Sequence, residues 1–420
     1  MNVRLGVALI MAAGFGLPAE DPLMRMRAKM AANLDRLPDY TCLETIERTV
    51  RKNPAPEQPV DILRFEIAYV GGRELLSWPG EKKFENKPID QMMGGAGAIG
   101  TGNFAQHARN LFRTRSATFS GPVEEVRDGH ARFRWDFQVP RERSSFYVGT
   151  LKRAELVAYH GSFWVDPETL DLVRLETFAD GMSKRTGISA DRETIEYSRV
   201  RIGDTDFLLP LLSELTLVDT RGYEHRNRTR FSGCRQFVSE SAISFADPPP
   251  AAAVREPAAL REVDLPAGLL MDVRLEAPID LAHVAIGDPI QAALARPLRK
   301  GSVDYPEGAK MIGRVTRMER RSLSSGRGLI ACRLIGVQLL SLEAAGMRAT
   351  VISRLVSVRG RDDVYYVPFV ARPNFRLDRW RGVDETIAMP TPGEGVFLRT
   401  GEDGTLPAGL RLQWRTLRRP

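Results

Sequence analysis

The sequence predicts a mainly β (α+β) protein, in which an open antiparallel half-barrel with a helical lid is linked to a second small β-barrel or sandwich domain. From about residue 40 to residue 237, short strand patterns follow one another between turn signals, with two helical stretches before Val238. A Pro- and Ala-rich segment then interrupts the pattern before strands resume. We therefore expect these parts: 1–19 signal peptide, 20–242 half-barrel domain, 243–264 linker and 265–420 C-terminal basic β-barrel domain.

The N-terminus has the pattern of a secretory signal peptide. Arg4 precedes an apolar run from Leu5 to Leu17, and cleavage after Ala19 is plausible for the small residues that follow. The run is too short to span a bilayer comfortably, and a buried first helix is the alternative. We expect a periplasmic or otherwise exported protein with no transmembrane segment in the mature chain.

The first domain begins with an amphipathic helix, which ends before Pro38. Its apolar residues Leu23, Met26, Met30 and Leu34 recur at helical spacing. Strand patterns follow, and the first hairpin turns at Gly71-Gly72. A curved antiparallel sheet wrapped around a helix fits this order better than a βαβ arrangement.

Several of these strands carry aromatic residues that could face one interior. In most folds such residues form an ordinary core, but a ligand cavity would use the same ones. The candidates for lining a cavity are Phe65, Tyr69, Trp78, Phe133, Trp135, Phe163 and Trp164.

The stretch "MMGGAGAIGTGNF" contains a G-x-G-x-x-G match, but it lacks the context of a dinucleotide site. No apolar strand precedes it, and no acidic residue lies about 20 positions further on. We interpret it as the entry to a short helix that begins near Asn103. The glycines expected to form a lid loop are Gly94, Gly95, Gly97, Gly100 and Gly102.

The chain has three cysteines, Cys42, Cys234 and Cys332. Cys332 lies in an apolar run typical of a buried strand. Cys42 and Cys234 lie near the two ends of the first domain, and in an oxidising compartment we expect them to form a disulfide.

No catalytic, metal or cofactor site is predicted. The five histidines show no metal-ligand spacing. His160, Ser162 and Asp166 lie close together in the sequence, but without a nucleophile elbow they are a weak hydrolytic pattern. The carboxylates Glu44 and Glu47 resemble a pair on a solvated surface.

The net positive charge of the chain lies in the second domain. Residues 265–420 contain 24 Lys and Arg against 16 Asp and Glu, while the whole chain has a net charge of +7. This excess indicates either a solvated surface or attraction to an anionic envelope component, and we expect no nucleic-acid partner.

The stretch "GSFWVDPETLDLVRLE", with Trp164, Val165, Asp166 and Thr169 at a turn between strands, resembles the LolA-like superfamily of periplasmic lipoprotein carriers. The likeness covers about residues 20–240 and implies an unclosed barrel whose apolar concavity holds acyl chains. Residues 265–355 are similar, more weakly, to the β-barrel segment of type IV secretion outer-channel proteins, which implies a structural or docking role.

These observations together indicate a non-enzymatic, exported envelope protein that binds a lipid or a lipidated partner in the half-barrel. One alternative is a structural or sensory protein-interaction module whose barrel is filled by its own side chains. Another is a hydrolase of envelope polymers, which would need a cleft with converging polar groups that the sequence does not show.

Overall fold

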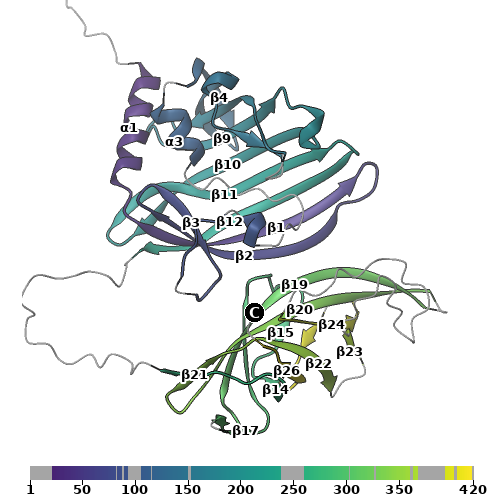
Figure 1. The fold of residues 1–420 in the computed structure, drawn as a ribbon. Helices are drawn as coiled ribbons and strands as arrows, with labels where there is room; N and C mark the ends of the chain where they lie inside the picture. The colour runs from purple at the N-terminus through teal and green to yellow at the C-terminus, as the bar shows by residue number, and fades with distance from the viewer. Residues whose placement is uncertain are drawn as a thin grey trace, which may run out of the picture.

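A computed structural model describes residues 21–418 except 82, 88, 93–105, 115, 150–152, 238–259, 302, 326–327, 360–362, 368–392 and 402–403. Strands dominate the described chain and form two ten-stranded sheets, accompanied by short helices (Figure 1). The fold class expected from the sequence is therefore confirmed. The signal peptide, nearly all of the linker and the glycine loop lie outside the described residues, so the domain limits stay predictions.

The first sheet has the strand order β3-β2-β1-β12-β11-β10-β9-β8-β5-β4, and its neighbouring strands are antiparallel. Its strands are β1 (Tyr40–Lys52), β2 (Gln58–Val70), β3 (Arg73–Ser77), β4 (Thr118–Arg127), β5 (His130–Val139), β8 (Ala158–Val165), β9 (Leu172–Asp180), β10 (Ile188–Ile202), β11 (Thr205–Asp219) and β12 (Tyr223–Gln236). The associated smaller elements are α1 (Pro22–Arg36), α2 (Ile89–Met92), α3 (Gln106–Arg113), η1 (Arg141–Arg143), β6 (Tyr147–Val148), β7 (Glu155–Leu156) and η2 (Lys184–Thr186).

Helix α1 forms where local signals and packing agree. Asp21 caps its first turn by accepting a hydrogen bond from the Leu23 N–H, and Pro22 occupies the first helical position, where no N–H is needed. Met26, Met30 and Leu34 are buried against the sheet. The helix ends before Pro38, as the sequence predicts.

One face of the first sheet is covered by α1 and α3 (Figure 1), and we call it the helix-covered face. The strand registers define a row of side chains on this face, because residues paired across neighbouring strands point to the same side. The row runs through Ile46, Thr229, Ser213, Ile195, Leu175, Phe163 and Trp135. The opposite face, which we call the outer face, carries most of the sheet's charged side chains.

The second sheet has the order β13-β21-β20-β19-β16-β14-β26-β22, and β24 pairs with both β20 and β23. Its strands are β13 (Arg261–Glu262), β14 (Leu270–Leu275), β16 (Pro289–Leu294), β19 (Lys310–Ser325), β20 (Gly328–Ala344), β21 (Met347–Thr350), β22 (Ser353–Arg359), β23 (Val364–Val367), β24 (Glu394–Thr400) and β26 (Arg411–Thr416). Smaller pairs are β15 (Ile279–Asp280) with β25 (Thr405–Leu406), and β17 (Leu298–Lys300) with β18 (Val303–Tyr305).

The second sheet curls until β22 lies beside β24, so that it comes close to closing on itself. Its interior is filled by Val273, Ile335, Leu355, Phe397 and Trp414, all of them buried. Gly395 makes room for the indole, since a Cβ there would lie 2.4 Å from Trp414 Cη2.

The two sheets meet at the edge of β2. Strand β3 pairs with β2 only from Val70 back to Glu66, which leaves the next residues of β2 without a strand partner on that side. Ile286 takes this place: its carbonyl accepts from the Arg64 N–H at 2.8 Å, and its N–H donates to the Ile62 carbonyl at 2.7 Å. A single buried apolar cluster consequently runs from the first sheet into the second.

Side chains reinforce this contact. Arg64 Nη1 lies 2.6 Å from both carboxylate oxygens of Asp288, and Arg314 donates to Glu81 while its guanidinium lies 4.7 Å above the Trp78 ring. Gly287 has φ +106°, and a Cβ there would lie 2.3 Å from the Arg64 carbonyl oxygen. A larger residue would therefore separate the two sheets at this point.

Candidate functional site

Four of the seven aromatic candidates are buried on the helix-covered face: Phe65, Tyr69, Trp135 and Phe163. Around Phe163 the rings pack on one another. Phe163 stacks on Trp135 with ring centroids 5.4 Å apart, and it meets Phe112 of α3 edge-on at 5.1 Å. Phe119 of β4 completes the contact at 5.9 Å. The helix α3 thus covers an aromatic cluster built from three strands.

Of the other three candidates, Phe133 shares the helix-covered face but is less buried, whereas Trp78 and Trp164 lie elsewhere. Phe133 is partly buried and lies edge-on to Trp135. Trp78 stacks on Phe65 with centroids 4.8 Å apart, but its other contacts are Arg314 and Gly287 of the second sheet. Trp78 therefore belongs to the junction of the two sheets.

Trp164 lies on the outer face. Its indole N–H donates to Glu125, and the guanidinium groups of Arg127 and Arg174 lie 4.7 and 5.9 Å from its ring. Successive side chains of a strand point to opposite faces, so Trp164 and Phe163 cannot line the same interior. The sequence-based set that included both is corrected on this point.

The two covering helices are held differently. The Asn33 side chain of α1 is buried and exchanges two 3.0 Å hydrogen bonds with the backbone of Leu208. The hydrogen bond and the ion pair that described side chains of α3 make lie at the surface: Asn110 Nδ2 to Ser145 Oγ at 2.7 Å, and Arg113 to Asp35 of α1. Arg109 of α3 adds a contact below the surface, its guanidinium 5.3 Å from the ring of Tyr69. Buried hydrogen bonds resist opening more than exposed ones, so α3 is the more easily displaced part of the cover.

Glu44 lies on the helix-covered face of β1 between Cys42 and Ile46, and it is fully buried. Among the described residues, neither of its carboxylate oxygens has a hydrogen-bond partner. Burial, and after it the nearby Glu74, raises the pKa of Glu44 well above its usual value. The interpretation of Glu44 and Glu47 as a surface pair is therefore wrong for Glu44, while Glu47 is exposed.

Other polar groups lie at the same end of this face. Tyr40 pairs with Tyr69 across β1 and β2, Tyr69 pairs with Glu74 of β3, and the Arg109 guanidinium of α3 lies 5.3 Å from the Tyr69 ring. Burial raises the pKa of both tyrosines, and Glu74 adds to the effect. We call Tyr40, Glu44, Tyr69, Glu74 and Arg109 the polar end of the interior.

The disulfide expected from the sequence is present. Cys42 on β1 and Cys234 on β12 are bonded, with their Cα atoms 4.1 Å apart, at an irregularity in the pairing of these neighbouring strands. Cys332 is buried on β20, as its apolar surroundings predict. The five glycines expected to form the lid loop, Gly94, Gly95, Gly97, Gly100 and Gly102, lie outside the described residues.

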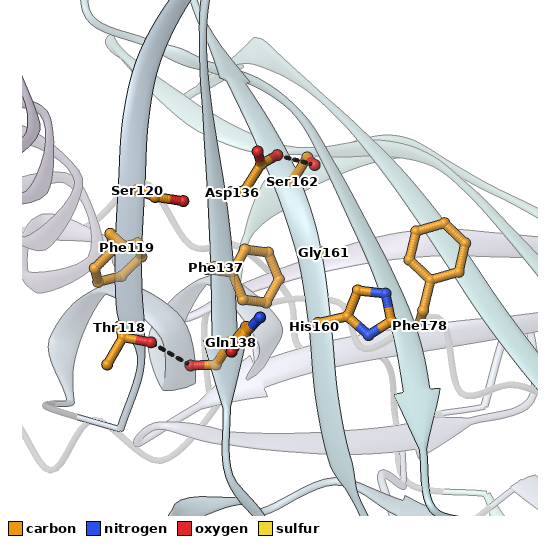
Figure 2. Close-up of a pocket in the computed structure, with 10 residues that line it drawn as sticks. All are labelled: Thr118, Phe119, Ser120, Asp136, Phe137, Gln138, His160, Gly161, Ser162 and Phe178. Atoms are coloured by element: carbon orange, nitrogen blue, oxygen red, sulfur yellow. Dashed lines mark hydrogen bonds between the residues drawn. The ribbon is translucent and has the colours of Figure 1, made fainter.

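A groove of about 490 Å³ lies over β4, β5, β8 and β9 (Figure 2). On its floor Ser162 Oγ donates to Asp136 at 2.6 Å. His160 stacks on Phe178, and its Nδ1 lies 2.7 Å from Asp180. Figure 2 shows the Ser162–Asp136 pair apart from the His160–Phe178 pair.

The hydrolytic pattern His160–Ser162–Asp166 is not assembled. The carboxylate of Asp166 accepts from the backbone N–H groups of Glu168 and Thr169 and pairs with Arg132, so it stabilises the turn after β8. Hydrogen bonds from that turn lower the pKa of Asp166, which keeps it ionised. Ser162 donates to Asp136 and not to His160, so the Ser–His hydrogen bond that this pattern requires is missing.

Within the described residues, no group of three or more His, Cys, Asp or Glu side chains could hold a metal ion. In the same part of the chain, no helix has the length and apolar character needed to cross a membrane.

No protein-family model and no curated protein sequence matches the chain. Solved structures do. A LolA superfamily protein from Nitrosomonas europaea is 12% identical, with a TM-score of 0.28, over 52% of this chain and 94% of its own. A putative outer membrane lipoprotein-sorting protein domain from Vibrio parahaemolyticus is 10% identical, with a TM-score of 0.28, over 50% of this chain and 91% of its own.

A DUF1329 family protein from Desulfovibrio piger is 13% identical, with a TM-score of 0.26, over 53% of this chain and 95% of its own. Each of the three matches covers about half of this chain. At such scores the description of the fold rests on the strand order and registers given above. The resemblance of residues 265–355 to outer-channel proteins stays a prediction.

Proposed function

We propose that this protein is an exported, non-enzymatic envelope protein that binds a lipid or a lipidated partner on the helix-covered face of its first sheet. The observation that carries the proposal is the pairing of a broad apolar face with a cover, α3, whose described side-chain hydrogen bond and ion pair are exposed. Displacing α3 would uncover Phe163 and its neighbours, which is the surface an acyl chain needs.

Two further observations support the proposal. The Cys42–Cys234 disulfide suits an oxidising compartment such as the periplasm. The polar groups of the outer groove pair with carboxylates or aromatic rings in a way that supplies no activated nucleophile. A binding role therefore fits the described side chains better than hydrolysis.

The test uses two neighbouring residues on opposite faces. In the full chain, Phe163→Ala should weaken binding of a fluorescent acyl probe about tenfold, because the ring is part of the apolar face. Trp164→Ala, on the outer face of the same strand, should leave the affinity unchanged. The protein should be purified from the compartment to which it is exported. Lipid extraction and native mass spectrometry of this material should show a bound lipid.

Absence of any co-purified lipid, together with no acyl-probe binding by the unmodified chain, would contradict the proposal. Equal effects of the two substitutions would place the binding surface elsewhere.

The packed rings favour a second candidate, a structural or sensory protein-interaction module. Trp135 and Phe163 stack at an interplanar angle of 12°, as in a core that needs no ligand. This candidate predicts that added amphiphiles do not raise the melting temperature. Under the first candidate they raise it, since a ligand that binds only the folded chain stabilises it. An anionic partner for the basic second domain stays a prediction.

A further inference from the structure

Glu44 is a buried carboxyl group in the interior of the first sheet. Its side chain is fully buried and points to the helix-covered face of the first sheet. Helix α3 covers other strands of this same face. Both oxygens lack a hydrogen-bond partner in the described residues. A buried carboxyl group without partners destabilises a fold, so a group of this kind is retained at a cost of folding free energy.

Two other side chains of the polar end are also incompletely paired. The hydroxyl of Tyr69 and the Nε of Arg109 are buried, and within the described part of the chain neither has a hydrogen-bond partner. Donors and acceptors left open in one region are what a polar ligand group would use, and all three side chains belong to the polar end of the interior.

The charge balance of the polar end selects the ligand group. It has two carboxyl groups, Glu44 and Glu74, whose mutual repulsion is evident from the effect of Glu74 on Glu44. One guanidinium, that of Arg109, lies over the Tyr69 ring. A second cation placed among these groups would relieve the repulsion and donate hydrogen bonds to the free carboxylate oxygens of Glu44, whereas an anion would meet both carboxyl groups.

The apolar cluster under α1 and α3 adjoins the polar end. Tyr197 packs with Met26, Phe163 and the rest of that cluster, and it also interacts electrostatically with Tyr40 of the polar end. A molecule that occupied both regions would be an amphiphile.

We propose that the polar end binds the primary ammonium head group of an amphiphile, with Glu44 as the acceptor, while the acyl chain lies against the apolar cluster around Phe163. This inference rests on the proposed function and specifies the ligand class for that site.

The experiment compares three amphiphiles that have the same alkyl chain length and different head groups. Binding of dodecylammonium, 1-dodecanol and dodecanoate to the full chain is measured by calorimetry below their micellar concentrations. The unmodified protein should bind dodecylammonium about tenfold more tightly than dodecanol, with dodecanoate the weakest. Glu44→Gln should abolish the preference for ammonium and leave dodecanol binding unchanged, while the exposed Glu47→Gln on the same strand should behave as the unmodified protein.

Proton release gives a second measurement that needs no variant. Burial raises the pKa of Glu44, and an ammonium partner would lower it again, so binding of dodecylammonium should release protons. Release is found by repeating the titration in buffers with different ionisation enthalpies. The other titratable or charged groups that act on this site are Glu74, Tyr40, Tyr69 and Arg109, with Tyr197, Arg113 and Asp39 around them.

The outcomes separate the two proposals. If dodecanol binds but dodecylammonium shows no preference and no proton release, the head-group inference is overturned and the proposed function stands. The same holds if Glu44→Gln keeps the preference. If none of the three amphiphiles binds, both proposals fail together.

Discussion

The two ten-stranded sheets bury their interiors by different means. In the second sheet β22 lies beside β24, and Trp414 with its aliphatic neighbours fills the space that the strands enclose. The first sheet ends at β3 and β4, and its interior is covered by α1 and α3. An interior closed by strands is fixed by their backbone hydrogen bonds, whereas one closed by helices can be opened by moving a helix. Among the described residues, buried polar atoms without a hydrogen-bond partner are found in both interiors, Glu44 in the first and Trp414 Nε1 in the second, but the carboxyl group lies on the helix-covered face.

Loss of the disulfide should have the largest effect on the stability of the first sheet relative to the second. Cys42 and Cys234 are 192 residues apart in sequence, so the Cys42→Ala/Cys234→Ala variant should destabilise the first sheet by about 5 kcal/mol in the chain-entropy estimate. Hydrogen exchange read by mass spectrometry should show faster exchange for peptides of β10 and β11 and little change for β19 and β20. Equal acceleration in both sheets would mean that they unfold as one unit.

The second largest effect should come from the hydrogen bonds that hold α1, in contrast to those that hold α3. Asn33→Ala removes two buried hydrogen bonds to Leu208 and should cost about 2 kcal/mol, because the backbone groups of Leu208 are left without partners. Asn110→Ala removes an exposed bond of α3 and should change the free energy of unfolding by less than about 0.5 kcal/mol. Urea denaturation of both variants is the measurement. Similar costs would contradict the view that α3 is the weakly held part of the cover.

The junction of the two sheets can be tested through Arg64 and Asp288. Their ion pair is partly buried, so a double-mutant cycle of Arg64→Met and Asp288→Asn should give a coupling energy of about 1 kcal/mol. In calorimetry each variant should separate the unfolding transitions of the two sheets. A coupling energy near zero would show that the backbone pairing of Ile286 with β2 carries the junction alone.

The pH dependence of stability should depend on Glu44. A raised pKa in the folded protein means that the stability contributed by this group is fully present below the unfolded pKa, near 4.5, and is lost as the pH rises above that value. The unmodified protein should therefore lose stability relative to Glu44→Gln by up to about 1.4 kcal/mol per pH unit above that point. Urea midpoints measured from pH 4 to pH 8 give the slope, and Glu47→Gln serves as the control. A constant difference across this range would show that Glu44 is ionised in the folded chain.

The sequence pointed to aromatic residues of the helix-covered face but not to its buried polar groups, and that those aromatic residues line a ligand site stays a prediction. Aromatic residues in strand patterns identified Phe65, Tyr69, Trp135 and Phe163, and apolar flanks identified Cys332 as buried. Phe163 and Trp164 are adjacent in one strand, so their side chains point to opposite faces of the sheet and cannot line one cavity. Glu44 and Glu47 are three residues apart, an odd spacing that also places their side chains on opposite faces. Stricter use of alternation along "TCLETIE" would have placed Glu44 with Cys42 and Ile46.

By itself, the sequence determined the local structure: α1 with its cap and its buried stripe, the strands with their glycine turns, and the cysteines available for pairing. These follow from interactions between residues close together in the chain. The tertiary structure decided which strands are neighbours, so that Cys42 meets Cys234, Ile286 joins the free edge of β2, and Glu44 is buried on the helix-covered face. Contacts of this kind depend on register and curvature over hundreds of residues, for which a local pattern holds no information.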